Sequence, residues 1–223
     1  MNSRTRGAAG WARLAALVTL ASLAGCFSLA REETPQRKYV LGGSVLEERG
    51  APSSALTGVT IGVRRLRLAS YLEPQYVAVR LGSHEIRYSE FHQWGERLDA
   101  GISRAVVTYL TARAPFGAVD VAPWAARGSY DYLLQLQIER FEGVTTAEPD
   151  ATAGEVHLLA TWELIRQSDG QVLTRGVTDH RQPQWVVGDY AGLVRALDVG
   201  LDVLARDLVA ALEALERAAP EDP

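Results

Sequence analysis

Four histidines and one cysteine are the side chains of this sequence best suited to nucleophilic, acid–base or metal chemistry. The histidines fall in separate segments: His84 in a turn, His92 at an expected helix start, and His157 and His180 on two expected strands. The pair His84–Glu85 is followed by Ile-Arg-Tyr, so it is not part of an HExxH zinc motif. A single cysteine cannot build a zinc-type cysteine cluster. We therefore expect no metal site and no catalytic histidine.

Motifs for phosphate binding, dinucleotide binding and serine catalysis are also missing from the sequence. It contains no Gly-x-Ser-x-Gly, no Walker A loop and no Gly-x-Gly-x-x-Gly after an expected strand. Paired carboxylates occur at Glu32–Glu33, Glu47–Glu48 and Asp198/Asp202. We expect them in a tether, a loop and the polar face of a helix, where they would be solvated charges. The sequence predicts that the chain is not an enzyme and uses no cofactor.

The single cysteine, Cys26, is the residue whose context does predict a chemical modification. It follows Leu23, Ala24 and Gly25, and this order matches the bacterial lipobox. In a lipobox the cysteine thiol is lipidated, and cleavage before it makes it the mature N-terminus. A lone cysteine has no disulfide partner within the chain, which agrees with lipidation. Because two or more acyl chains anchor a protein stably, we expect Cys26 to hold the domain on a membrane.

The residues before Cys26 have the layout of a secretory signal peptide. A positively charged start is followed by an uncharged, largely apolar run over Leu14–Ala24. This run is shorter than the roughly 20 apolar residues that a membrane-spanning helix needs. We interpret residues 1–25 as a signal peptide, and residues 26–37 as the lipidated cysteine with a short polar tether.

The charge of the chain argues against nucleic acid as a partner. Its 23 basic and 27 acidic residues give a formal net charge of −4. Loss of the three arginines within residues 1–25 leaves 20 basic residues and a net charge of −7. Binding to a phosphate backbone requires clusters of Lys and Arg, which this composition does not favour.

Alternating apolar residues predict a series of strands in the mature chain. The turn residues Gly82–Ser83 and Asp169–Gly170 indicate two hairpins between them. The strand over 59–66 carries Arg64, Arg65 and Arg67 at or near its solvated face. The expected strands are residues 38–41, 59–66, 76–81, 85–88, 119–122, 130–141, 155–166 and 172–181.

Two stretches change to the period of an amphipathic helix. The first runs from Phe91 to Leu110, with Ser89 as its expected N-cap. Two glycines inside this stretch weaken it, each by up to about 1 kcal/mol relative to Ala. The second runs from Tyr190 to Leu215, with Asp189 as its expected N-cap.

The order of strands, helix, strands and helix predicts an α+β fold, with two long helices packed on one face of a mostly antiparallel sheet. We find no internal repeat and no linker inside the mature chain. The sequence therefore predicts one domain over residues 38–217 and a polar tail over residues 218–223.

Two groups of aromatic residues, Tyr88/Phe91/Trp94 and Trp185/Tyr190, lie beside the expected helix starts. One interpretation is structural, with both groups capping the core. The other is a surface that faces a partner, because Trp and Tyr are enriched at binding hot spots. The sequence leaves both interpretations open.

In this order of motifs the sequence resembles the ABC-type transport auxiliary lipoproteins, the PqiC-like group. The resemblance covers most of the mature chain, and its most specific part is the Tyr-x-Glu-Phe-x-x-Trp block. The matching segments are the lipobox, Tyr39–Leu41, Leu68–Leu72, Leu81–Gly82, Tyr88–Trp94 and Trp185–Tyr190 before the last helix.

The resemblance implies a fold similar to the TolB N-terminal domain and a role in moving lipids or other hydrophobic compounds between two membranes. The implied partners are an ABC transporter and a channel protein of the mammalian-cell-entry type, with a possible homo-oligomer to suit the channel. The residues that match the specific block, and which we expect to contact a partner, are Tyr88, Glu90, Phe91, His92 and Trp94.

Sorting follows from the residue after the lipidated cysteine. That residue is Phe27 and not aspartate, which in the sorting pattern of Gram-negative lipoproteins favours the periplasmic face of the outer membrane. An alternative function is an envelope lipoprotein that regulates a cell-wall synthase, because such regulators can use a similar small α+β domain.

Overall fold

The computed structural model describes residues 35–43, 54–124, 129–148 and 150–218. Cys26, the signal peptide, most of the tether and the tail beyond Ala218 lie outside these residues, so those expectations stay predictions. The pairs Glu32–Glu33 and Glu47–Glu48 also lie outside them.

A long central strand, β7 (Tyr132–Thr145), organises the sheet. On one side it pairs antiparallel with β8 (Ala153–Arg166), which pairs antiparallel with β9 (Val172–Val186). The β8–β9 turn contains Gly170 at φ 71°, a conformation that glycine adopts without a steric penalty. The hairpin predicted from Asp169–Gly170 is confirmed.

The other side of β7 receives three short strands in succession, all parallel to it. They are β2 (Thr60–Val63), β3 (Arg67–Leu68) and β4 (Tyr76–Leu81). A 3-10 turn, η3 (Ser70–Leu72), and Pro74 separate β3 from β4. The sequence predicted one strand over 59–66, and the structure instead has β2 and the separate β3.

The remaining strands lie at the margins of this sheet. β5 (Glu85–Trp94) forms the predicted hairpin with β4, and β1 (Arg37–Tyr39) pairs parallel with its second half. β6 (Ala118–Val121) pairs parallel with β2. A second 3-10 turn, η2 (Ser54–Leu56), precedes β2.

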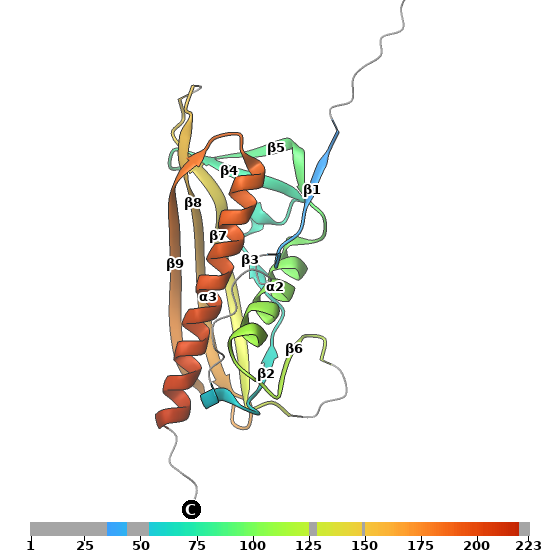
Figure 1. Cartoon of the computed structure of the whole chain (residues 1–223), viewed down its shortest axis with the longest axis vertical. Coiled ribbons are helices and arrows are strands. Elements are labelled where there is room, and N and C mark those ends of the chain that lie inside the picture. Colours follow the sequence, from blue (N-terminus) through green and yellow to red (C-terminus); the bar gives the residue numbers. More distant parts are fainter. Residues whose placement is uncertain (1–34, 44–53, 125–128, 149, 219–223) are drawn as a thin grey trace, which may run out of the picture. The chain divides into compact units, whose positions relative to one another are not determined.

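Two helices, α2 (Leu98–Arg113) and α3 (Tyr190–Ala218), cover one face of the sheet (Figure 1). The longest ladders are antiparallel, and the parallel pairings are short. The predicted α+β class with two helices on one face is confirmed. Likeness to the TolB N-terminal domain stays a prediction. Neither described helix combines the length and apolarity needed to cross a membrane.

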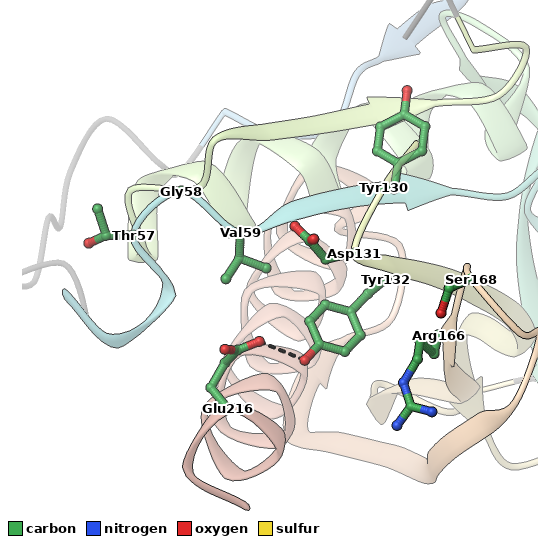
Figure 2. Close-up of a pocket in the computed structure, with 9 residues that line it drawn as sticks. All are labelled: Thr57, Gly58, Val59, Tyr130, Asp131, Tyr132, Arg166, Ser168 and Glu216. Atoms are coloured by element: carbon green, nitrogen blue, oxygen red, sulfur yellow. Dashed lines mark hydrogen bonds between the residues drawn. The ribbon is translucent and has the colours of Figure 1, made fainter. Parts of the chain in front are cut away.

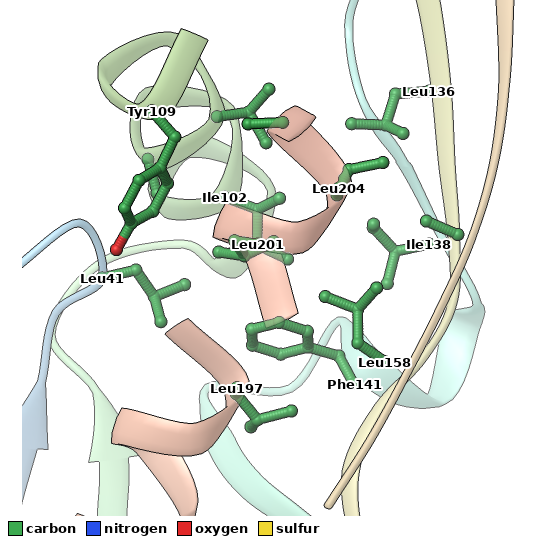
Figure 3. Packing of buried hydrophobic residues seen from close by; sticks show 14 of the residues in the cluster. Leu41, Ile102, Tyr109, Leu136, Ile138, Phe141, Leu158, Leu197, Leu201 and Leu204 are labelled. Carbon is green, nitrogen blue, oxygen red and sulfur yellow. The ribbon is translucent and has the colours of Figure 1, made fainter. Parts of the chain in front are cut away.

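The core lies between the helices and the sheet (Figure 3). Leucines of α3 pack between α2 and the inward side chains of β7 and β8. Leu41, just after β1, is 3% exposed and inserts beside the helices, so the N-terminal strand is part of the core. The fully buried side chains include Ile102, Leu136, Ile138, Leu158, Leu197, Leu201 and Leu204.

The first helix begins nine residues later than Ser89, at Leu98, so the predicted start is wrong. The segment predicted as its first turns continues β5 as far as Trp94. Gly95 ends the strand where β1 passes close by: its amide donates to the Tyr39 carbonyl at 2.7 Å. Pairing with β4 and β1 therefore overrides the helical spacing of the aromatic residues.

The second helix begins as predicted. Asp189 Oδ1 accepts the amide of Gly192 at 2.9 Å, and the Asp189 carbonyl accepts the amide of Leu193, also at 2.9 Å. These are the bonds of an N-cap residue, so the predicted cap is confirmed.

The expectation that Asp198 is a solvated charge is wrong. This residue of α3 is 6% exposed, and its Oδ1 accepts the amide of Gly42 at 2.8 Å. Gly42 has φ 86°, and a Cβ there would lie 3.5 Å from the backbone of Ala105 on α2. Asp198 thus fastens the segment after β1 to the helix pair. Asp202, one turn later, pairs with Arg113 and Arg206.

Candidate partner-binding site

The residues predicted to contact a partner lie on a bulge of β5. Ala78 of β4 is opposite Tyr88, and Tyr76 is opposite Gln93, so four residues of β5 face a single residue of β4. The extra residues, 89–92, are lifted out of the ladder with β4. A bulge bends a strand and redirects its side chains, and bulges are frequent beside functional sites.

Within the bulge, Ser89 makes the bond that led the sequence analysis to place a helix cap there. Its Oγ accepts the amide of His92, three residues later, at 3.2 Å. Serine makes this bond both at helix N-termini and in isolated turns. Ser89 is 7% exposed, so it stabilises the bulge from within.

Trp94 supports the block from the core. It is 4% exposed, and its ring lies 5.7 Å from that of Phe141 on β7. Its amide donates to the carbonyl of Gln75 at 2.7 Å, before β4 begins. A side chain buried to this extent positions the block and offers little surface to a partner.

His92 joins the two aromatic groups that the sequence presented separately. Its ring stacks on Tyr190, the first residue of α3, at 4.2 Å, and Tyr190 meets Trp185 edge-on at 6.5 Å. On the other side, the Tyr39 hydroxyl of β1 lies 2.8 Å from His92 Nδ1. Burial, with a smaller contribution from Arg37, lowers the pKa of His92. The neutral ring can therefore accept a hydrogen bond from the Tyr39 hydroxyl.

Tyr88, Glu90 and Phe91 are the members of the block that face outward. Tyr88 is 37% exposed and Phe91 40% exposed, and Glu90 is exposed as well. Tyr76, at the start of β4, is also 40% exposed. We name Tyr76, Tyr88, Glu90 and Phe91 the aromatic rim.

A buried ion pair holds the rim from the side opposite the helices. The Tyr88 hydroxyl donates to the Tyr71 carbonyl at 2.8 Å, and the Tyr71 ring lies 5.3 Å from the Arg80 guanidinium. Arg80 Nε in turn donates to Glu142 at 2.6 Å, and the Glu142 side chain is fully buried. Burial and the neighbouring Glu142 raise the pKa of Tyr71, so it stays protonated at neutral pH.

The sequence analysis missed Tyr39, Tyr71 and Tyr76 as neighbours of the block. Tyr39 and Tyr71 were noticed only as parts of short family segments, and their contacts with the block join residues 53 and 17 positions apart. The pairing of β1 with β5 brings Tyr39 to the block, and a contact from η3 brings Tyr71. Neither contact can be predicted from the spacing of nearby residues.

A polar pocket of about 530 Å³ lies at the other end of α3, and several of its side chains have partners in or beside it (Figure 2). The Tyr132 hydroxyl donates to Glu216 at 2.6 Å. Asp131 accepts the amide and the hydroxyl of Thr60 at 2.8 and 2.7 Å. Arg166 donates to the Asp169 carboxylate across the β8–β9 turn at 2.8 Å. The arrangement ties α3 to the start of β7.

The remaining histidines are dispersed in the structure, as their sequence positions suggested. His157 of β8 is 1% exposed on the face without helices, and its Nε2 lies 2.9 Å from Asp179. His180 of β9 lies on the other face, beside Gly200 of α3. Within the described residues, no group of three His, Cys, Asp or Glu side chains is placed to hold a metal.

Solved structures with a similar fold share little sequence with this chain. Protein XCC0632 from Xanthomonas campestris matches with a TM-score of 0.60 and 18% identity, over 75% of this chain and 93% of that one. A second crystal structure, of an uncharacterized protein, matches with a TM-score of 0.57 and 19% identity, over 74% of this chain and 99% of that one. At this identity the likeness shows the fold alone. No curated protein matches the sequence significantly.

The family comparison is more specific than the structural one. The model of the ABC-type transport auxiliary lipoprotein component matches residues 39–209. This span begins in β1, includes the whole aromatic rim and the buried ion pair behind it, and ends inside α3. It covers most of the chain, which therefore belongs to the family of ABC-type transport auxiliary lipoproteins.

Proposed function

We propose that this protein is a lipid-anchored, periplasmic adaptor of an ABC-type transport system that moves lipids or other hydrophobic compounds between the two membranes. Family membership supports the transport role. The adaptor role rests on one observation: the aromatic rim presents Tyr88 and Phe91 to solvent at a bulge that the buried Ser89 and Trp94 hold in place.

Several contacts make the rim suitable for binding a protein. Trp94 and His92 are held by Phe141, Tyr39 and Tyr190, so the bulge is anchored from β7, β1 and α3 at once. Rigid exposed aromatic side chains lose little conformational freedom on binding and are frequent hot spots. Tyr88, Glu90 and Phe91 would make the contact, whereas His92 and Trp94 would position them.

The anchor and the partner complete the proposal. Lipidated Cys26 would hold the protein at the periplasmic face of the outer membrane. The partner at the rim would be a channel protein of the mammalian-cell-entry type, working with the ABC transporter, and a homo-oligomer of this chain would suit such a channel. The role is that of a binding protein and not an enzyme.

Site-specific photo-crosslinking in cells tests the proposal. Phe91 is replaced by p-benzoylphenylalanine in the full precursor, and captured proteins are identified by mass spectrometry. Trp124 serves as the matched control, because it is an aromatic residue of similar exposure, 36%, outside the rim. We expect channel or transporter subunits to be captured from position 91 and not from position 124.

Two outcomes would contradict the proposal. Capture of a cell-wall synthase from position 91 would favour the alternative, a lipoprotein that regulates cell-wall synthesis. Equal capture from positions 91 and 124 would show that the aromatic rim is not the specific contact surface. The Cys26→Ala precursor tests the anchor independently, because it should leave the outer-membrane fraction whichever partner is found.

A further inference from the structure

We propose that a second site, between β3 and the start of α2, binds the phosphate group of a phosphate ester. This site is separate from the aromatic rim and goes beyond the adaptor role. Its pocket has a volume of about 580 Å³. The residues that line it are Arg65, Leu66, Arg67, Leu68, Glu73, Arg97, Leu98, Asp99 and Gln137.

The alternation of residues 65–68 places two cations on one side of the chain. Leu66 is 5% exposed and belongs to the core, whereas Arg65 and Arg67 are both exposed. Arg67 lies opposite Gln137 of β7 in the parallel ladder. Among the described strands, β3 pairs only with β7, and both of its residues line the pocket.

Among the arginines that line this pocket, Arg65 and Arg67 have no anionic partner, whereas Arg97 has one. Within the part of the chain that the structure describes, no carboxylate lies within salt-bridge distance of either. Arg80, Arg97 and Arg175, by contrast, each bind a carboxylate at 2.6 to 2.8 Å. Two unpaired guanidinium groups in one pocket favour an anionic ligand.

The start of α2 also lines the pocket and adds positive potential there. The residue before the helix, Arg97, makes no side-chain capping bond, and the helix runs for 16 residues from there. Its N-terminal end carries a partial positive charge. Asp99 also lines the pocket, but Arg97 neutralises it through bonds of 2.8 and 3.0 Å and lowers its pKa. Glu73 is the one remaining acid of the lining.

The chemical class of the ligand follows from the two arginines and from the surface beside them. Guanidinium groups bind phosphate oxygens in bidentate fashion, and a phosphate has oxygens to spare for more than one arginine. A second pocket shares Arg67 and Gln137 and continues over the face without helices to Thr161 and Val177. Val177 is 62% exposed, so this extension offers apolar surface to the organic part of an ester.

Calorimetric titration of the full-length lipidated protein in amphipol tests the phosphate site. The probes are glycerol 3-phosphate and inorganic phosphate, at low ionic strength because surface charges are screened by salt. We expect binding in the wild type and about tenfold weaker binding, or more, in the double variant Arg65→Gln/Arg67→Gln. Glu73→Gln should tighten binding a few-fold, because it removes the one carboxylate that repels the ligand.

Arg195→Gln is the matched control, because it removes an exposed arginine of α3 far from the pocket in sequence and outside its lining. It should leave the affinity unchanged. No binding in the wild type, or equal losses in Arg195→Gln and in the double variant, would overturn the proposal and would leave the adaptor role untouched.

Dihexanoyl phosphatidate distinguishes a lipid head group from a free phosphate as the natural source. If the ligand is a lipid, this short-chain ester should bind more tightly than inorganic phosphate, and Val177→Glu should weaken only the ester. If the ligand is a free phosphate, both probes should bind equally and Val177→Glu should affect neither. Either pattern supports the site, provided that the double variant Arg65→Gln/Arg67→Gln weakens the binding about tenfold or more.

Discussion

Glycines opposite tryptophans determine how the sheet accommodates its largest side chains. The indole of Trp162 lies over Gly176 on the neighbouring strand, where a Cβ would come within 2.0 Å of its ring. Trp185 uses Gly143 in the same way, with a corresponding distance of 2.6 Å. Trp162 also donates to Thr178, which donates in turn to Asp207 of α3. The ring therefore has little room to move.

Gly176→Ala should destabilise the protein by about 1–3 kcal/mol through overpacking. The measurement is urea unfolding followed by circular dichroism. Gly43→Ala is the control, because nothing lies within 4 Å of a Cβ at that position. Trp162→Phe should recover part of the loss in the double variant, since a smaller ring leaves room for the methyl group. Additive losses would show that the indole is not the obstacle.

The buried histidine of β8 predicts a dependence of stability on pH. Burial lowers the pKa of His157, with a smaller contribution from Arg181. Below the ordinary value of about 6.5 the unfolded state therefore binds more protons than the folded state, and stability falls as the pH decreases. The pKa values of His92 and His180 are lowered by burial as well, which adds to the same trend.

His157→Gln should reduce the loss of stability between pH 7.5 and pH 5.5, because glutamine can donate to Asp179 and does not titrate. Urea midpoints at the two pH values measure the effect. The same pH dependence in His157→Gln and the wild type would exclude His157 as a source.

At the scale of elements, the segment from β1 to Gly42 is a strap that links the N-terminal side of the domain to both helices. Asp198 accepts the Gly42 amide, and the Leu41 carbonyl accepts from Arg104 of α2 at 3.1 Å. β1 itself pairs with β5 over His92–Trp94. If the segment from β1 to Gly42 moves, its pairing with His92–Trp94 transmits the movement to the strand that carries the aromatic rim.

Asp198→Ala should cost about 1–3 kcal/mol, because it leaves the Gly42 amide without its partner. Hydrogen exchange should show faster exchange at Gly42 and Gly95, with the second half of α3 unchanged. Asp202→Ala, one turn later on the same helix, provides the comparison. Its ion pairs are partly exposed and should contribute less than about 1 kcal/mol. Equal losses would show that the burial of Asp198 is unimportant.

The far end of α3 depends on one hydrogen bond from the sheet. Tyr132 donates to Glu216, and burial together with this carboxylate raises the pKa of Tyr132. Glu216→Gln should therefore lower that pKa, which a spectrophotometric titration of tyrosinate can detect. It should also increase fraying of the last turn. An unchanged titration curve would mean that burial alone sets the pKa.

Elements with strong local signals could be predicted from the sequence, whereas those decided by distant partners could not. The β8–β9 hairpin and the start of α3 follow from Asp169–Gly170 and Asp189, and both are confirmed. The predicted start of α2 was wrong because a serine such as Ser89 can accept an amide three residues later both at a helix cap and in a bulge. The alternation of apolar residues predicts that a strand forms but not which strand it pairs with. The parallel pairings of β2, β3 and β4 with β7 could therefore not be predicted.

The candidate site likewise has residues that the sequence could identify and contacts that it could not. Its outward residues, Tyr88, Glu90 and Phe91, were selected by resemblance to a motif, and their exposure agrees with a surface role. The burial of Trp94 and the stacking of His92 on Tyr190 depend on β1, β7 and α3, which meet only in the folded chain. The unpaired Arg65 and Arg67 were visible in the sequence as charges, but their lack of partners was not.

At the scale of the whole described fold, the sheet has a long open edge that must be kept from pairing with other chains. β9 pairs only with β8 among the described strands, so its outer side is free along 15 residues. Val177 is exposed at its centre, between Arg175 and Arg181. Charged residues on an edge strand oppose edge-to-edge association, and Pro183 removes one donor near its end.

The double variant Arg175→Val/Arg181→Val should therefore aggregate faster on heating, as measured by light scattering at equal protein concentration. Both arginines form ion pairs that are largely exposed, so the melting temperature itself should change little. Arg195→Val/Arg217→Val removes the same net charge from α3 and should not aggregate faster. Both double variants become more negative by the same amount, which by itself opposes aggregation. If both nevertheless aggregate faster, the added valines and not the edge are responsible; if only the β9 variant does, the charged residues of the edge strand protect it.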